Sequence, residues 1–140
     1  MLGSQPPTPN SQPPIPVRAH VVLASGVRLA VGVADTPQTR ARGLMNRESL
    51  GEVDGLLFVF DEADRHTFWM RNTLVPLDIA WLDDDGRIVR ITADVQPCRL
   101  PPCPRFRPSV PARYVLETVA GRLRREDVHE GDCLAIDWTA

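Results

Sequence analysis

The sequence predicts a mainly β domain of the α+β class, with about eight strands and two short helices in a compact, barrel-like arrangement. Short runs rich in valine, leucine and isoleucine recur between turn residues, and only two short segments carry helix signals. A chain of 140 residues with 43% hydrophobic side chains is long enough for one core and too short for two ordinary domains. Because closure removes exposed sheet edges, we expect so many strands on so short a chain to form a small barrel.

A proline-rich leader is expected over residues 1–16, followed by a single β-rich domain over residues 17–140. The leader contains six prolines and no charged side chain, which is typical of a disordered or polyproline-like segment. It lacks the apolar stretch of a secretory signal. Such a leader suits an exported protein whose signal has been removed, so we expect a periplasmic or secreted location, with the cytoplasm as the alternative.

The first part of the domain is predicted to be a hairpin followed by a helix. Residues 17–23 and 27–34 are β-branched runs on either side of a short link that contains glycine. A helix is expected to begin at Asp35 or Thr36, because either side chain can cap the first turn and Pro37 fits that turn. With Asp35 as the cap, Gln38 would complete a capping box. The helix is expected to end near Gly43.

The middle of the domain is predicted to be a meander of three consecutive antiparallel strands and a returning fourth. Turn residues separate these apolar runs, and Asp83-Asp84-Asp85-Gly86 is the strongest turn signal. The strands are expected at residues 56–60, 66–71, 77–82 and 87–93, with a turn at residues 61–64.

The last part of the domain is expected to begin with an irregular segment. Residues 94–112 carry six prolines, which disfavour regular structure. A strand at residues 114–118, a short helix at residues 123–128 and a final strand at residues 133–138 are then predicted.

The most informative stretch runs from Arg65 to Asp78, because large apolar side chains there adjoin a polar cluster. Apolar area beside convergent polar groups is what a binding pocket is built from, and it is equally what a satisfied core turn is built from. In the functional interpretation the pocket is formed by Met45, Trp69, Met70, Arg71, Asn72 and Asp78. In the structural interpretation Asp78 is a buried acceptor that ties down the turn. Its expected partners are Arg71, Asn72 and the backbone N–H groups of residues 73–76.

Three functions remain open for this stretch. The first is a non-enzymatic ligand-binding or partner-binding accessory protein of the cell envelope, and this is the one that we expect. The second is a hydrolase with Asp78 as general base and Arg71 or Asn72 stabilising developing negative charge. The third is a soft-metal site for copper formed by Met45, His66 and Met70, although methionine is also a common filler of cores.

Other kinds of function have little support in the sequence. No nucleophile elbow, zinc-protease motif, phosphate loop or dinucleotide fingerprint is present, and no cofactor is expected. A net charge of −2 gives no electrostatic reason to bind nucleic acid. No window is apolar enough to span a bilayer. The expected partner is a small molecule or a protein segment.

The three cysteines divide into a close pair and a single residue. Four residues separate Cys98 from Cys103, and the two cysteines can form a local disulfide or remain two free thiols. We predict the disulfide, which fits an exported protein. Cys133 is expected to be a free, buried residue at the start of the last strand, beside a surface His129.

Four spaced motifs resemble the bacterial and archaeal family called domain of unknown function 192. The resemblance lies in residues 33–45, 55–60, 68–78 and 111–117, the last followed by Gly131-Asp132. It covers roughly residues 20–138. The resemblance implies a small β-rich fold, often preceded by an export segment, and it implies no reaction. No catalytic role is therefore assigned from the family.

Overall fold

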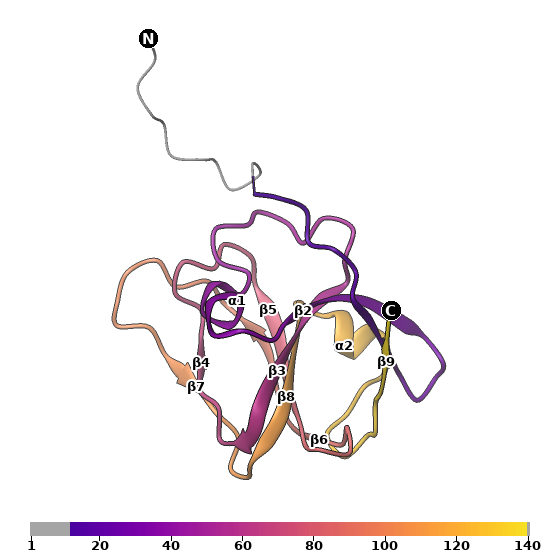
Figure 1. Ribbon diagram of the computed structural model, residues 1–140. Helices are drawn as coiled ribbons and strands as arrows, with labels where there is room; N and C mark the ends of the chain where they lie inside the picture. The colour runs from indigo at the N-terminus through magenta and orange to yellow at the C-terminus, as the bar shows by residue number, and fades with distance from the viewer. Residues whose placement is uncertain (1–11, 140) are drawn as a thin grey trace.

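The computed structural model describes residues 12–139, and within them nine strands and two short helices confirm the mainly β prediction (Figure 1). No helix in this range is long and apolar enough to cross a membrane. The leader prediction for residues 1–11 lies outside the described residues. The elements are β1 (Ala19–Val22), β2 (Arg28–Ala34), α1 (Pro37–Arg42), β3 (Gly55–Asp64), β4 (Phe68–Trp69), β5 (Leu77–Leu82), β6 (Ile88–Val95), β7 (Arg105–Phe106), β8 (Ala112–Val119), α2 (Arg122–Arg125) and β9 (Ala135–Trp138).

Seven strands form one sheet in the order β6-β5-β8-β3-β2-β1-β9, and β4 and β7 form a separate two-stranded ribbon. The sheet is not closed into a barrel, which corrects the expectation of closure. The segment before β9 meets the β6 end of the sheet through an isolated bridge between Arg87 and Cys133 and through hydrogen bonds from Gly131 to Ile88 and from Ile91 to Glu130, without a continuous strand ladder. All neighbouring strands are antiparallel except β2 and β3, which are parallel because the α1 crossover separates them in the sequence.

The sheet has an apolar core on each face, as the two-residue period of its strands requires. One face contributes Leu57, Ala80 and Leu116, which pack with Leu123 of α2. The other contributes Phe58, Trp81 and Val115, which pack with residues of the α1–β3 connection and of the β4–β7 region. In Figure 1, α1 and the ribbon lie on the left of β3 and β8, and α2 lies on the right.

The predicted hairpin and first helix are both present. β1 pairs with β2 in antiparallel register, and Leu29 and Val31 point into the core. Thr36 is the N-cap of α1, and its hydroxyl accepts a hydrogen bond from the Thr39 backbone N–H at 3.1 Å. Thr39, and not Gln38, completes the capping box, because the cap is one residue later than Asp35.

The meander predicted for residues 56–93 is wrong in its second strand. β3 continues to Asp64 through the expected turn, and its two edges are occupied by β2 and β8. Along Gly55–Phe58 both edges of β3 are already paired, so residues 66–71 cannot form a ladder with that part of the strand. The strand in this segment is therefore only Phe68–Trp69, and it pairs with Arg105–Phe106 from the proline-rich segment.

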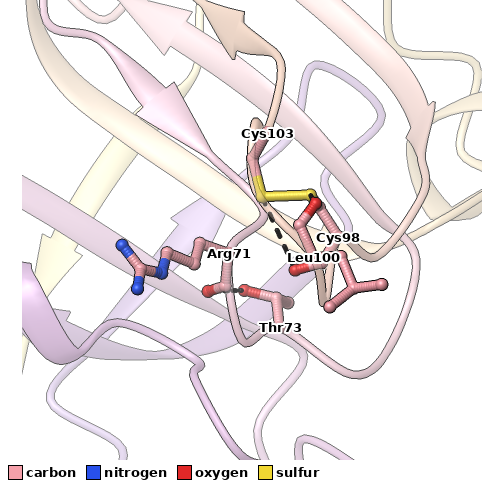
Figure 2. The surroundings of a disulfide bond; sticks show 5 residues. All are labelled: Arg71, Thr73, Cys98, Leu100 and Cys103. Carbon is pink, nitrogen blue, oxygen red and sulfur yellow. Dashed lines mark hydrogen bonds between the residues drawn. A yellow bond between two sulfur atoms is a disulfide. The ribbon is translucent and has the colours of Figure 1, made fainter.

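A disulfide joins Cys98 to Cys103 and braces the turn that follows β4 (Figure 2). The backbone N–H of Asn72 donates to the Cys98 carbonyl at 3.1 Å, and the Cys98 N–H donates to the Met70 carbonyl at 3.3 Å. Cys133 carries a free thiol and is exposed, so the expectation that it is buried is wrong. It precedes the last strand instead of lying within it.

This arrangement of cysteines predicts a simple labelling pattern. In protein prepared under oxidising conditions and denatured without reductant, iodoacetamide should modify one thiol, on Cys133, and peptide mapping should find Cys98 linked to Cys103. After reduction, all three should be modified. Labelling of all three cysteines without reductant would contradict the disulfide.

Candidate functional site

Two buried acids lie on the neighbouring strands β5 and β8 and point to opposite faces of the sheet. The register pairs Asp78 with Thr118 and Ile79 with Glu117. Side chains alternate between faces along a strand, so Asp78 lies on the α2 face and Glu117 lies on the face covered by α1 and the β4–β7 ribbon. Both acids are almost fully buried, with exposed fractions of 1% and 4%.

Asp78 is fully satisfied by backbone groups. Its Oδ1 accepts from the N–H of Asp94 at 2.9 Å, and its Oδ2 accepts from Gly121 at 3.0 Å and Leu123 at 3.2 Å. Arg71 and Asn72, its expected partners, make none of these bonds. A carboxylate that accepts three backbone N–H bonds ties chain segments together. The geometry therefore supports the structural interpretation of Asp78.

Glu117 has the opposite environment. No hydrogen bond or ion pair joins its carboxyl group to another residue in the described range 12–139. Burial raises the pKa of Glu117 to about 8. An acid without a protein partner is costly to keep ionised inside an apolar core, so the carboxyl is largely neutral near pH 7 in the free protein.

A cavity of about 290 Å³ opens beside Glu117. Its size is close to the lower end of the range typical of small-ligand pockets, roughly 300–1,000 Å³. Its wall is mostly apolar and aromatic, and its only ionisable side chains besides Glu117 are two arginines. The lining residues are Arg40, Ala41, Arg42, Gly43, Leu44, Met45, Phe58, Phe60, Thr67, Phe68, Trp69, Thr73 and Glu117.

Phe68 organises the aromatic side of this cavity. Its ring makes edge-to-face contacts with Phe58 at 4.8 Å and with Trp81 at 6.0 Å between ring centroids. Such T-shaped pairs are a preferred arrangement of aromatic rings. The indole N–H of Trp81 donates to the His66 carbonyl at 3.0 Å, which holds the chain just before β4. The wall is thus positioned by the core on which it rests.

The cavity collects only some of the residues predicted to form a pocket. Met45 and Trp69 line it together with Glu117. Met70 is buried and lines a different cavity beside the disulfide loop. Arg71 is exposed, with its guanidinium carbon 5.6 Å from the centre of the Trp69 ring. Asn72 is also exposed and has a positive φ of 56° in the turn after β4.

The residues proposed for a copper site do not share one cavity. Met45 and Met70 line separate cavities, and His66 lines neither. The His66 ring is stacked on Phe60, with ring centroids 3.5 Å apart. Its Nε2 lies 3.0 Å from the Glu62 carbonyl oxygen. These contacts favour a packing role for His66.

Glu117 is the site residue that sequence reasoning missed. It is an acid inside the apolar strand at residues 114–118, which is the same signal that singled out Asp78. The two acids differ in their partners, and the three N–H groups that satisfy Asp78 come from residues 16, 43 and 45 positions away. The sequence therefore shows that both acids lie in apolar strands. Which of the two acids has hydrogen-bond partners depends on tertiary contacts.

Comparison with known proteins gives a consistent family match. The DUF192 family model, described as "Uncharacterized ACR", matches residues 20–136. A UPF0127 protein of Thermococcus gammatolerans is 36% identical over 117 residues, which cover 78% of this chain and 67% of the relative. A UPF0127 protein of Thermococcus kodakarensis is 33% identical over 114 residues, with coverages of 78% and 64%. The chain thus spans about two thirds of the length of these relatives.

Two solved structures are also similar. A Sinorhizobium meliloti protein proposed to be a transcription regulator has a TM-score of 0.75 at 35% identity, over 85% of this chain and 92% of that one. A protein of unknown function from Novosphingobium aromaticivorans has a TM-score of 0.75 at 33% identity, over 86% and 84% of the two chains. These matches agree with the fold described above.

Replacing Asp78 by asparagine should destabilise the protein. Asparagine keeps one acceptor oxygen and turns an NH₂ group toward the remaining backbone donors, so at least one buried N–H loses its partner. We expect the free energy of unfolding to fall by about 1–3 kcal/mol, measured by urea denaturation. Asp61→Asn on the exposed surface is the control and should change stability little. Equal stability of the two variants would contradict the structural role of Asp78.

Glu117 should make stability depend on pH. Its pKa is raised in the folded protein, so the folded state binds more protons than the unfolded state between about pH 4.5 and 8. The free energy of unfolding should fall as pH rises through this window, with this residue contributing up to ~1.4 kcal/mol per pH unit. Glu117→Gln should remove that contribution and make the protein more stable than wild type at pH 8.

The same urea measurements at pH 5 and pH 8 provide the check. Glu52→Gln, on an exposed loop, is the matched control and should keep the wild-type pH dependence. If wild type and Glu117→Gln lose stability equally between the two pH values, Glu117 does not titrate as described.

Proposed function

The chain belongs to the DUF192 family of uncharacterised proteins, and from its cavity we propose that it is a non-enzymatic binding domain of the cell envelope that holds a small molecule against Glu117. The proposal keeps the binding function predicted from the sequence. It replaces Asp78 by Glu117 as the acidic residue that contacts the ligand. Met45 and Trp69 remain as walls of the site.

The observation that supports this proposal is the unpartnered carboxyl group of Glu117 at an otherwise apolar cavity. Burying a carboxyl group without a partner destabilises a fold, and structural acids are normally hydrogen-bonded as Asp78 is. A buried acid with a raised pKa that faces a cleft is a typical feature of functional sites. A ligand that completes the bonding of Glu117 would explain why the acid is placed there.

A hydrolase is less well supported by the same geometry. Asp78 is enclosed and cannot reach a substrate in the cavity, so it is unsuited to act as general base. The lining contains one carboxyl group and two threonine hydroxyls, and no serine, cysteine or histidine belongs to it among the described residues. General acid–base catalysis by Glu117 would need a second group from the substrate or from water. We therefore place binding before catalysis.

A location in the cell envelope is supported by the disulfide. Structural disulfides persist in oxidising compartments and are rare in the cytosol. Cys98 and Cys103 are bonded and support the turn that carries Asn72.

The binding role can be tested by blocking the cavity. Ala41 lies on the exposed side of α1 and lines the cavity, so Ala41→Phe should fill part of it without disturbing the core. A thermal-shift screen of small molecules should give compounds that raise the melting temperature of wild type, because a ligand that binds only the folded state stabilises it. These shifts should be lost in Ala41→Phe.

Gln38→Phe is the matched control, since Gln38 is exposed on the same helix and does not line the cavity. It should retain the shifts. Compounds that stabilise Ala41→Phe as strongly as wild type would show that they bind elsewhere and would contradict the proposed site.

A further inference from the structure

We infer that the ligand of this cavity carries a protonated amine, whose ammonium group pairs with the Glu117 carboxylate while its apolar part lies among the aromatic side chains. This inference rests on the proposed binding function and specifies the chemical class of the ligand.

The first step of the argument is that the protein supplies no cation for Glu117. The cavity has two arginines, both from α1, and neither is paired with the acid. The Arg40 Nη1 donates to the Val59 carbonyl at 2.9 Å, and the Arg40 guanidinium lies over the Phe60 ring at 5.2 Å. Arg42 is exposed at the end of the helix. No side chain in the described range 12–139 therefore balances an ionised Glu117, which leaves its carboxylate available to a cationic ligand.

Acids elsewhere in the fold are treated differently. Asp54 is partly buried, and its Oδ1 pairs with Arg122 at 3.0 Å while its Oδ2 accepts from the Ala30 N–H at 2.8 Å. Asp78 has its three backbone donors. The Glu117 carboxyl group, in contrast, has no partner in the protein. A buried carboxylate is stabilised most by a directly paired cation.

The second step concerns the walls. Phe58, Phe60, Phe68 and Trp69 line the cavity, and the faces of aromatic rings attract cations. The Phe60 ring already shows this contact, because the Arg40 guanidinium lies over it at 5.2 Å. The Trp69 ring already has two guanidinium groups near it, those of Arg71 at 5.6 Å and Arg105 at 5.1 Å. Apolar walls also exclude water and so strengthen a charge pair formed within them. These features favour an organic ammonium ion over a strongly hydrated metal ion.

The third step distinguishes two kinds of ligand that carry an amine, a simple alkylamine and an amino acid. A simple alkylamine would use Glu117 and the rings alone. An amino acid would also present a carboxylate, and Arg40 and Arg42 of α1 are the cavity residues able to bind it. Both share the ammonium group that Glu117 recognises, and the two are distinguished by comparing butylamine with leucine.

Binding of an amine should be coupled to the ionisation of Glu117. The charged groups that face it across the cavity are Arg40 and Arg42, and the remaining lining side chains are uncharged. Because burial raises the pKa of Glu117 to about 8, the empty site is mostly protonated at pH 6. A cation must then displace that proton, so affinity for butylamine should be about tenfold or more higher at pH 8 than at pH 6.

The experiment is isothermal titration of the whole chain with butylamine, butanol and leucine in phosphate buffer at pH 6 and pH 8. We expect butylamine to bind, butanol to bind at least tenfold more weakly, and the pH effect on butylamine to disappear in Glu117→Gln together with most of its affinity. Glu52→Gln should behave as wild type does. Tighter binding of leucine than of butylamine, lost in Arg40→Gln, would identify an amino acid as the ligand class.

The outcomes separate this inference from the binding function on which it rests. Binding of butanol equal to that of butylamine, or full butylamine affinity in Glu117→Gln, would overturn the amine inference while leaving the cavity as a binding site. If the thermal-shift screen finds no compound whose effect depends on Ala41, the binding function itself fails. Circular dichroism of Glu117→Gln verifies that the variant is folded in either case.

Discussion

The central antiparallel pairing of β5 with β8 is the constraint on which the rest of the structure depends. It places two acids one residue apart in register, Asp78 opposite Thr118 and Glu117 opposite Ile79, and the pleat turns them to opposite faces. A shift of β8 by one residue relative to β5 would turn Glu117 to the α2 face of the sheet. Glu117 would then no longer face its cavity. The same pairing therefore fixes both the stability of the α2 face and the chemistry of the opposite face.

The two faces of the sheet differ in how their buried acids affect stability: Asp78 stabilises the fold, whereas Glu117 destabilises it. Asp78 collects backbone N–H groups from the end of β6 and from the start of α2, so one side chain joins three elements. Glu117 has no such compensation, and its burial opposes folding at neutral and alkaline pH. Destabilised groups are tolerated where the surrounding packing determines their position. Here that packing is the buried strand pair itself, which bears the acid on the face turned toward the cavity.

Local signals predicted the local structure, and non-local pairing accounts for most of what they missed. The β1–β2 hairpin and the capped helix at Thr36 follow from neighbouring residues. The partner of β4 does not, because Phe68 pairs with Phe106, and a proline-rich segment gives no strand signal. The candidate site shows the same difference between local sequence signals and non-local contacts. An acid in an apolar strand was recognisable at both positions, but only the folded chain shows which one lacks partners.

The structural elements that line the cavity differ greatly in stability. Its floor is formed by β3 and β8 of the central sheet. Its walls are a six-residue helix, a connecting loop and a two-residue strand, none of which would be stable alone. A chain of backbone hydrogen bonds links these walls. Asn46 donates to the Asn72 carbonyl at 2.8 Å, and Asn72 donates to Cys98 at 3.1 Å, at the disulfide. The loop that follows Met45 is thereby tied to the cross-linked segment. A cross-link outside the cavity thus helps to position its wall, while the sheet alone positions its acid.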